Sequence, residues 1–378
     1  MRILKHYCYA LVLLFSLGCK EEFSPQLKET TAKLLVVEGM INAGGERTYI
    51  RLSRTVPISE TGNRTPEIGA KVSIESNANQ SYLLTDIGKG EYQSEVLSLD
   101  PSKKYKLKIV TKNAEYTTDY LDVKLSPAID DIFWEAKSNG LQLYLNTHDD
   151  NNKSKYYRWE FDDTWIFHAK YYSALIWTGN AMRRRDVDTE NVYKCWGNGI
   201  SSSVIVGSTV KLNEDVVYKQ PIALIPSVSE KLSEKYSILV RQYVLTKEAF
   251  DFWENLRKNT ENLGSVFDAQ PSQLTGNIRN VKDPNEPVLG FISVGSIASK
   301  RIFVAKSELP DWKFSEPFDC GVPDTLLLSQ NYLFNDPNYV ALEEIYNDGG
   351  ILIGHTATQK RCGDCTFRGT TMRPAFWQ

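Results

Sequence analysis

The chain has 378 residues, enough for two domains or for one large elaborated domain. Its 44 basic and 47 acidic side chains leave a formal net charge of −3, so no broad basic field exists to hold nucleic acid and we expect no nucleic-acid partner. Aromatic residues make up 11% of the chain, and β-branched residues recur in short runs, which indicates a mainly β protein.

The N-terminal segment has the pattern of a lipoprotein signal peptide. A basic lead precedes an apolar run over residues 7–18, which is too short to span a bilayer but has the length of a secretory h-region. Gly18 supplies the small residue before Cys19, whose thiol would be diacylated before cleavage. We therefore expect a signal peptide over residues 1–18. The alternative is an ordinary signal peptide with an incidental cysteine, although such peptides usually end in an Ala-x-Ala pattern.

The residues that follow predict a lipidated tether over residues 19–33. Each buried methylene contributes about 0.8 kcal/mol, so the two or three acyl chains on Cys19 would hold the protein on a membrane almost permanently. Lys20, Glu21 and Glu22 resemble the Lys-acid-acid export signal of Bacteroidota lipoproteins. This resemblance predicts a lipid-anchored protein on the outer face of the outer membrane. A solvated charged tether is the other interpretation.

Short strands after the tether predict an N-terminal antiparallel β-sandwich over residues 34–125. The apolar, β-branched run 34–41 is typical of a buried strand, and lysines alternate with apolar residues over 104–109. Leu99 and Tyr105 have the spacing of a tyrosine corner, whose phenol bonds to the backbone upstream. We expect seven or eight strands, in a module that resembles the carboxypeptidase-regulatory or transthyretin-like domains of exported proteins.

A second β-rich domain is expected over residues 126–378. Leucines alternate with other residues over 141–145, and the strand 156–161 follows a polar turn, which together resemble a fibronectin-like or immunoglobulin-like hairpin. Between residues 165 and 200 the pattern becomes irregular and indicates a hairpin or loop insertion. The fold class predicted for the whole chain is therefore two β-sandwiches, the second one elaborated.

One helix is predicted clearly in this second domain, over residues 246–259. Thr246 is a suitable N-cap, and Ala249, Trp253 and Leu256 recur on one helical face that must pack on a sheet. A second helix is expected around residues 340–346.

Four cysteines remain after the signal peptide and Cys19: Cys195, Cys320, Cys362 and Cys365. An even number in an exported protein indicates two disulfides. We favour bridges from Cys195 and Cys320 to the Cys362/Cys365 pair; a bridge inside the pair, with Cys195 joined to Cys320, is the other arrangement. A redox motif would need a helix after Cys362, which the sequence does not predict. A zinc site of four cysteines would need thiols that an oxidising compartment does not keep.

Several segments can be compared with a known family. They are the lipobox cysteine, the run 35–39, Gly69-Ala70, the run 156–159, the block 264–278, and the ending from Cys362-Gly363-Asp364-Cys365 to Phe376-Trp377. Together they resemble the domain of unknown function 4249 family of Bacteroidota outer-membrane lipoproteins. Members often occur beside TonB-dependent transporters, so the resemblance implies a surface partner of such a transporter. It supplies no catalytic residues.

No enzyme motif is present in the sequence. It contains no Gly-x-Ser-x-Gly, no His-Glu-x-x-His and no glycine loop that could cradle phosphate, and we expect neither an enzyme nor a cofactor. The polar turn 148–152 offers oxygen ligands for calcium but lacks the Asp-x-Asp-x-Asp-Gly spacing, so a solvated hairpin loop is favoured and no metal is expected.

Aromatic side chains within the insertion are the candidate binding residues. They are Trp165, Phe167, Tyr171, Tyr172 and Trp177. Aromatic faces stack on sugars and anchor protein interfaces, although alternate members are expected in the core.

We therefore expect a non-enzymatic binding subunit beside a TonB-dependent transporter that serves nutrient uptake, with its contacts between Trp165 and Cys195. A stand-alone structural or adhesive surface lipoprotein is the alternative, and a glycan-active enzyme is a remote one.

Overall fold

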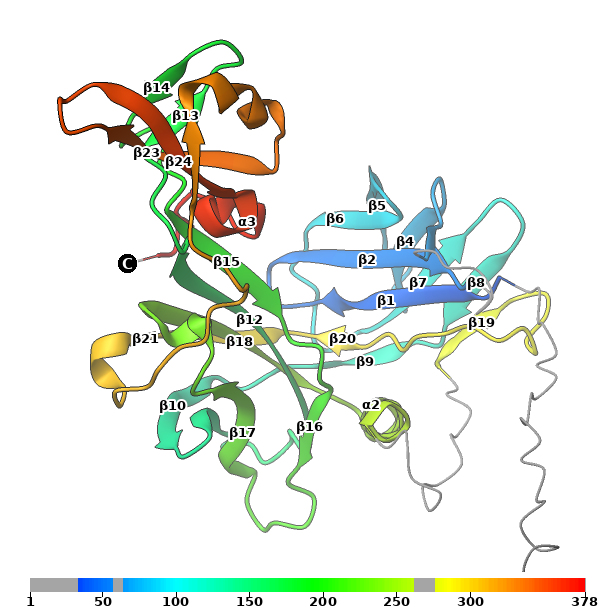
Figure 1. The fold of residues 1–378 in the computed structure, drawn as a ribbon. Helices are drawn as coiled ribbons and strands as arrows, with labels where there is room; N and C mark the ends of the chain where they lie inside the picture. The colour runs from blue at the N-terminus through cyan, green and yellow to red at the C-terminus, as the bar shows by residue number, and fades with distance from the viewer. Residues whose placement is uncertain (1–32, 57–63, 262–275, 378) are drawn as a thin grey trace, which may run out of the picture.

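The computed structural model describes residues 33–56, 64–261 and 276–377. The expected signal peptide, the lipidated Cys19 and the export signal at Lys20, Glu21 and Glu22 lie outside these residues. The described chain is mainly β, as predicted, and its strands form several sheets. Figure 1 shows three regions: a barrel-like sheet around β1 and β2, a second region around β12 and β18, and a projecting lobe around β23 and β24.

The first region is a barrel-like closed sheet of eight strands, which corrects the predicted sandwich. In their order around the barrel, the strands are β7 (Lys104–Val110), β4 (Lys71–Ser76), β5 (Ser81–Gly88), β6 (Glu91–Val96), β2 (Arg47–Arg54), β1 (Leu35–Asn42), β20 (Val294–Gly295) and β9 (Leu121–Lys124). The ring closes where β7 pairs with β9, at Tyr105 and Leu121. Three further strands extend it: β3 (Thr65–Pro66), β8 (Glu115–Thr118) and β19 (Ile278–Asn280).

The barrel uses chain from beyond the predicted domain boundary at residue 125. Strand β20 is parallel to both β1 and β9 and fills the gap between them. Ile278, Ile292 and Val294 are buried in the same core as Leu35 and Leu107. Residues 276–295 therefore belong to the first region, a correction that local pattern could not supply because β20 has only two residues.

The tyrosine corner is present at the start of β7. The hydroxyl of Tyr105 donates to the carbonyl of Asp100 at 3.2 Å, and the Tyr105 ring is buried. This bond fixes the loop that leads into the strand.

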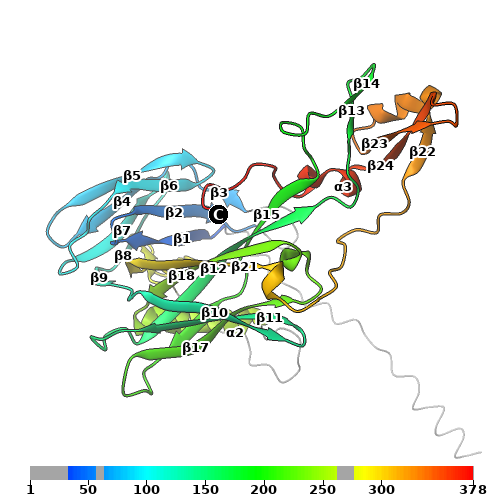
Figure 2. The ribbon, with the colours of Figure 1, turned by 90° about the vertical axis from the view of Figure 1, so that its left-hand side faces the viewer.

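The second region contains two sheets that share one core. A three-stranded sheet consists of β10 (Ile129–Lys137), β11 (Gly140–His148) and β17 (Val216–Pro226), and a five-stranded sheet of β15 (Lys194–Ile200), β12 (Tyr156–His168), β16 (Ile205–Ser208), β18 (Lys235–Val244) and β21 (Ile297–Ala305). Leu143 of the first sheet and Trp159 and Ile238 of the second are among the residues buried in this core. Figure 2 shows β10, β11 and β17 stacked below β12 and β18.

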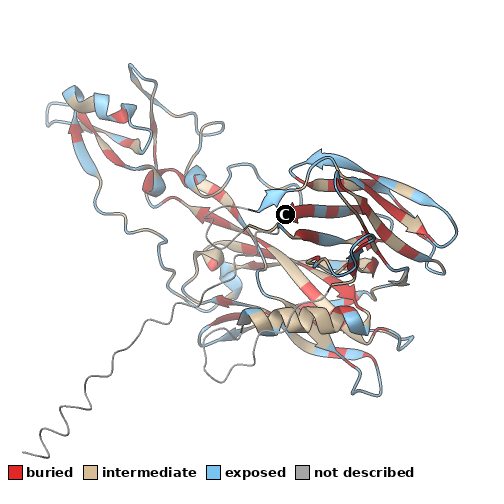
Figure 3. Cartoon of the chain, turned by 90° about the vertical axis from the view of Figure 1, so that its right-hand side faces the viewer, coloured by how far each residue is buried: buried red, intermediate tan, exposed pale blue. Residues whose placement is uncertain are grey.

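The predicted helix is confirmed as α2 (Lys247–Glu261). The Thr246 hydroxyl oxygen accepts from the N–H of Ala249 at 3.2 Å, which satisfies one of the free amides of the first turn. Ala249 is fully buried and packs with Tyr243 of β18, while Met40 and Phe291 of the barrel pack against the same cluster. The helix therefore lies at the junction of the two regions, and Figure 3 shows it half-buried along most of its length.

The third region, which we call the distal lobe, comprises residues 170–190 and 322–359. It contains the pair β13 (Leu175–Trp177) and β14 (Met182–Arg184), the sheet β22 (Asp324–Leu327), β24 (Leu352–Gln359) and β23 (Tyr339–Tyr346), and a 3₁₀ helix, Leu328–Asn335. The helix expected around residues 340–346 is wrong, because this run is β23, which pairs with β24 and buries Ala341 and Leu342. The remaining short helices are α3 (Lys360–Gly363) and 3₁₀ turns at Glu230–Leu232, Lys306–Glu308 and Cys365–Phe367.

Two disulfides join the distal lobe to the second region, in the pairing that the sequence favoured. Cys195 of β15 bonds to Cys365, and Cys320 bonds to Cys362. The two bridges lie near one another because Cys362 and Cys365 are three residues apart. Cys320–Cys362 joins the chain that enters residues 322–359 of the lobe to the chain that leaves them, and Cys195–Cys365 joins that leaving chain to β15.

Candidate functional site

A hollow with a volume of about 810 Å³ lies between the barrel and the second region. We call it the interdomain cavity. One wall is the outer side of β1, where Met40 faces α2, and the opposite wall is the face of α2 that carries Phe252, Trp253 and Leu256. Phe291, from the segment that leads into β20, completes the apolar lining, and its ring packs 5.4 Å from that of Phe252.

A cluster of polar side chains from β12 and β18 also lines the cavity. The guanidinium of Arg158 lies 4.0 Å from the ring centroid of Trp253 and 5.1 Å from that of Tyr243. Arg158 also donates to one carboxylate oxygen of Glu160 at 2.7 Å, and the Tyr243 hydroxyl donates to the other. The rings and the carboxylate together hold the guanidinium in one position.

The neighbouring Arg241 also lines the cavity and pairs with Asp162. The hydrogen bond that Arg241 donates to Asp162 raises the pKa of Arg241, and burial followed by the charge of Glu160 raises the pKa of Tyr243. Both side chains therefore remain protonated and act as hydrogen-bond donors at neutral pH.

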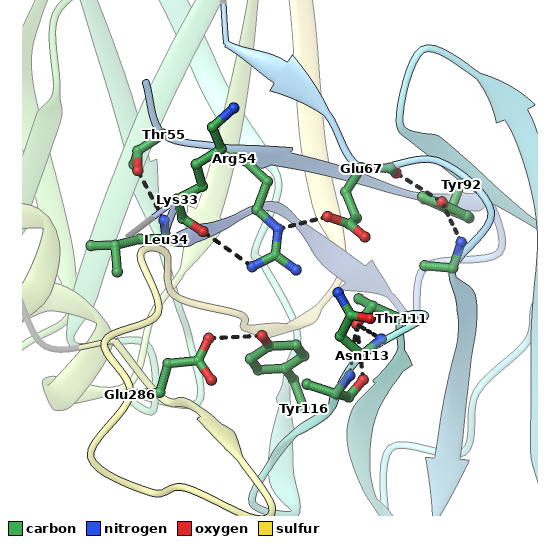
Figure 4. Close-up of polar contacts among 12 residues, drawn as sticks. Lys33, Leu34, Arg54, Thr55, Glu67, Tyr92, Thr111, Asn113, Tyr116 and Glu286 are labelled. Carbon is green, nitrogen blue, oxygen red and sulfur yellow. Dashed lines mark hydrogen bonds and ion pairs between the residues drawn. The ribbon is translucent and has the colours of Figure 1, made fainter. Parts of the chain in front are cut away.

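A second polar cluster lies beside the start of β1 (Figure 4). Arg54 of β2 donates to Glu67 at 2.6 Å and to the carbonyl of Lys33 at 3.3 Å. Tyr116 of β8 points toward Glu286 and donates to it at 2.8 Å. These bonds join three distant stretches of chain, so we interpret this cluster as structural and the interdomain cavity as the candidate binding site.

The aromatic residues predicted for binding are not gathered into the interdomain cavity. Trp165 is half-buried beneath the ammonium group of Lys231, which lies 4.5 Å from its ring. The Tyr171 hydroxyl donates to the carbonyl of Gly321 at 2.8 Å, and Trp177 donates from its ring nitrogen to Asn335 at 2.9 Å. Trp165 thus contacts another segment of the second region, and Trp177 contacts another segment of the distal lobe. Tyr171 binds the chain just before β22.

Tyr172 and Phe167 differ in exposure. Tyr172 is 44% exposed, and its ring meets that of Tyr193 edge to face at 5.5 Å. Phe167 is buried beneath the guanidinium of Arg368. Of the predicted aromatic set, Tyr172 is thus the member whose ring is most open to a partner.

The polar turn considered for calcium contains His148 and Asp149. One carboxylate oxygen of Asp149 accepts from the amides of Lys153 and Ser154 and from the Ser154 hydroxyl, so it organises the turn itself. The hydrogen bond to Asp130 raises the pKa of His148. Within the described parts of the chain, no three histidine, cysteine or acidic side chains are grouped so that they could hold a metal ion. No helix there has the length and apolar character to cross a membrane.

The comparison with protein families decides what kind of chain this is. The family model described as "Domain of unknown function (DUF4249)" matches residues 20–301. The chain belongs to the DUF4249 family. The matched range contains the barrel strands and every residue of the interdomain cavity named above, whereas the segment from Cys362 to Trp377 lies beyond it.

Curated proteins and solved structures provide the other comparisons for this DUF4249 chain. No curated protein matches its sequence. Among solved structures, FdeC, an adhesin of Escherichia coli, is 17% identical over 50% of this chain, with a TM-score of 0.13. The chain spans 62% of that adhesin chain. The BSP domain of a biofilm associated protein is 7% identical over 87% of this chain and 76% of its own, with a TM-score of 0.14. Scores this low carry no argument about fold or function.

The cavity residues of this DUF4249 chain were not predicted as a site from sequence. Arg158 and Glu160 alternate with the buried Tyr157 and Trp159, which indicates only that they face away from the core of the second region. The adjacent pair Phe252 and Trp253 did indicate that α2 contacts more than one surface. Together they make the apolar stripe of the helix wider than the face that packs on one sheet. A helix with such a stripe meets a second surface, which here is the barrel.

Proposed function

We propose that this protein is a lipid-anchored outer-membrane binding subunit that works beside a TonB-dependent transporter, without catalytic activity of its own. The observation that carries the binding role is the interdomain cavity, whose volume of about 810 Å³ falls within the range of small-molecule sites. Apolar walls with a few convergent polar groups are typical of such sites. Anchoring rests on the lipobox at Cys19, and the transporter partner on the family resemblance.

The distal lobe is the surface that we assign to the transporter. It contains the β13–β14 hairpin, which lies in the insertion between Trp165 and Cys195, and it exposes Tyr332, Tyr346 and Ile351. Exposed apolar side chains of this kind often mark protein interfaces. In Figure 1 the lobe lies at the upper left, away from the start of β1 at the right. The lobe is therefore free to reach a neighbour in the same membrane.

Purification of the tagged full chain from its native envelope in mild detergent tests this proposal. We expect a TonB-dependent barrel to accompany the protein in stoichiometric amount, identified by mass spectrometry. If the protein arrives alone, the transporter role is wrong, and a stand-alone structural or adhesive role replaces it.

A matched pair of variants tests the contact surface. Tyr332→Asp in the distal lobe is expected to reduce recovery of the barrel at least several-fold, because it places a charge in an apolar contact. Tyr218→Asp is the control, since Tyr218 is also strongly exposed, at 80% against 64% for Tyr332, but lies on β17 of the second region. Equal recovery with both variants would remove the distal lobe from the contact.

A further inference from the structure

We infer that the interdomain cavity binds a small molecule that has a planar apolar body and a single carboxylate group. This inference rests on the binding role proposed above and specifies the chemistry of the ligand.

The planar body follows from the aromatic rings that line the cavity. Phe252 and Trp253 come from α2 and Phe291 from the barrel segment, so rings from two separate regions face one space. Their centroids lie 5.4 Å apart for Phe252 and Phe291 and 5.5 Å apart for Phe252 and Trp253. Met40 and Leu256 extend the apolar lining. Rings favour flat partners, because offset stacking and edge contacts add to the gain from burial.

The carboxylate follows from the balance of hydrogen-bond donors and acceptors in the polar cluster. A guanidinium has five N–H donors, and Arg158 and Arg241 each donate to one carboxylate among the described residues. Both oxygens of Glu160, in contrast, already accept a hydrogen bond. The two guanidinium groups therefore keep more unused N–H donors than this cluster has unused carboxylate oxygens. A planar carboxylate can accept two parallel hydrogen bonds from one guanidinium.

Each arginine that lines the cavity already pairs with a carboxylate. The charged side chains that line it are Arg47, Arg64, Arg158 and Arg241 against Glu38, Glu46 and Glu160. Arg64 pairs with Glu38 at 2.8 Å, and Arg158 pairs with Glu160. Arg47 pairs with Glu95 at 3.2 Å, and Arg241 pairs with Asp162. Because these partners leave no positive charge in excess, the carboxylate is inferred from the unused guanidinium donors and not from net charge.

Isothermal titration calorimetry on the mature chain, produced without its lipid by Cys19→Ser, tests the inference with two probes. The probes are 2-naphthoate and 2-naphthamide, which have the same flat body and differ in the charge of one group. We expect naphthoate to bind saturably at one site and at least tenfold more tightly than naphthamide. Absence of saturable naphthoate binding, or equal affinity for the two probes, would overturn the inference with no variant needed.

Two double variants then locate the site. Arg158→Gln with Glu160→Gln keeps the net charge and is expected to lower naphthoate affinity to that of naphthamide. Arg51→Gln with Glu91→Gln makes the same exchange in an ion pair of the barrel that does not line the cavity, and we expect it to preserve the preference. The fold of the first variant is checked by circular dichroism. If this variant still binds naphthoate more tightly than naphthamide, the ligand binds at another place.

The two proposals fail separately. The calorimetry uses this chain alone, so naphthoate can bind when no transporter is recovered. The transporter can likewise be recovered when neither probe binds. A transporter without probe binding would leave the partner role in place and remove the carboxylate ligand.

Discussion

Glu135 of β10 shows how a single side chain can join two strands of the second region. Its carboxylate bonds to Lys137 at 2.6 Å and to Lys219 of β17. Hydrogen bonds from Lys137 and then from Lys219 lower the pKa of Glu135 to about 2. The two ammonium groups also lie over the ring of Tyr144. The ion pairs thus connect β10 and β17 across β11.

This cluster predicts a specific dependence of stability on pH. The pKa of Glu135 is lower in the folded chain than its usual value near 4.5, so its contribution is complete above about pH 5 and is lost as pH falls toward 2. Urea unfolding between pH 6 and pH 3 should therefore show a smaller loss of stability for Glu135→Gln than for the wild type. Parallel losses in the two proteins would contradict the assignment. Because the carboxylate is solvent-exposed, we expect the difference to be small.

At the scale of elements, the segment before β20 depends on a close approach of two backbones. The amide of Val37 donates to the carbonyl of Leu289 at 2.8 Å, and that of Leu289 to the carbonyl of Leu35 at 2.9 Å. Gly290 follows with φ of +124°, and a Cβ atom there would lie 2.0 Å from the carbonyl oxygen of Val37. No side chain fits between these backbones.

Gly290→Ala should consequently destabilise the protein by on the order of 2 kcal/mol or more, through strain at positive φ and displacement of the segment from β1. The matched control is Gly45→Ala, since Gly45 also has a positive φ, +81°, but no atom lies within 4 Å of the added Cβ. Chemical unfolding of both variants separates the cost of the steric clash with Val37 from the cost of a positive φ. A loss for Gly290→Ala no larger than that for Gly45→Ala would show that the close approach contributes nothing.

The same elements explain which parts of the fold the sequence predicts. Helix α2 was predicted because its cap and its spacing of Ala249, Trp253 and Leu256 are local signals. Strand β23 was mistaken for a helix, since its run of glutamates and apolar residues suits either state and its pairing with β24 decides the outcome. The place of strand β20 in the barrel was not predicted, because nothing in its two residues indicates that they pair with β1 and β9.

The candidate site was less predictable than the fold for a related reason. The cavity forms where Arg158 and Trp253 of the second region meet Met40 and Phe291 of the barrel, and no single stretch of sequence contains all four. The cysteines were more informative. Their even number, in a chain expected to be exported, indicated two bridges, and the favoured pairing is the one observed.

At the scale of the whole molecule, the two disulfides hold the distal lobe on the second region. Cys195–Cys365 closes a loop with a sequence separation of 170 residues, and Cys320–Cys362 one of 42 residues. In the chain-entropy model, the longer loop makes the first bridge the more stabilising by about 1 kcal/mol.

Cys195→Ala with Cys365→Ala should lower the free energy of unfolding by about 2–4 kcal/mol, and Cys320→Ala with Cys362→Ala by less. Urea titration of both variants beside the wild type checks the size and the order of the losses. Titration of thiols in the denatured mature wild type should find no free cysteine. Two or more free thiols, or variants as stable as the wild type, would contradict the scheme.

The closure of the barrel also sets the order in which the chain can fold. Strand β1 lies at the start of the described chain, yet its parallel neighbour β20 is synthesised only after the whole of β12, β18 and α2. Contacts between such distant residues form slowly, because a long loop must close before they contribute. The barrel thus cannot close before the chain as far as β20 has been made. Under the export that we propose, this delay would keep the leading segment unfolded and threadable until the rest of the chain has crossed.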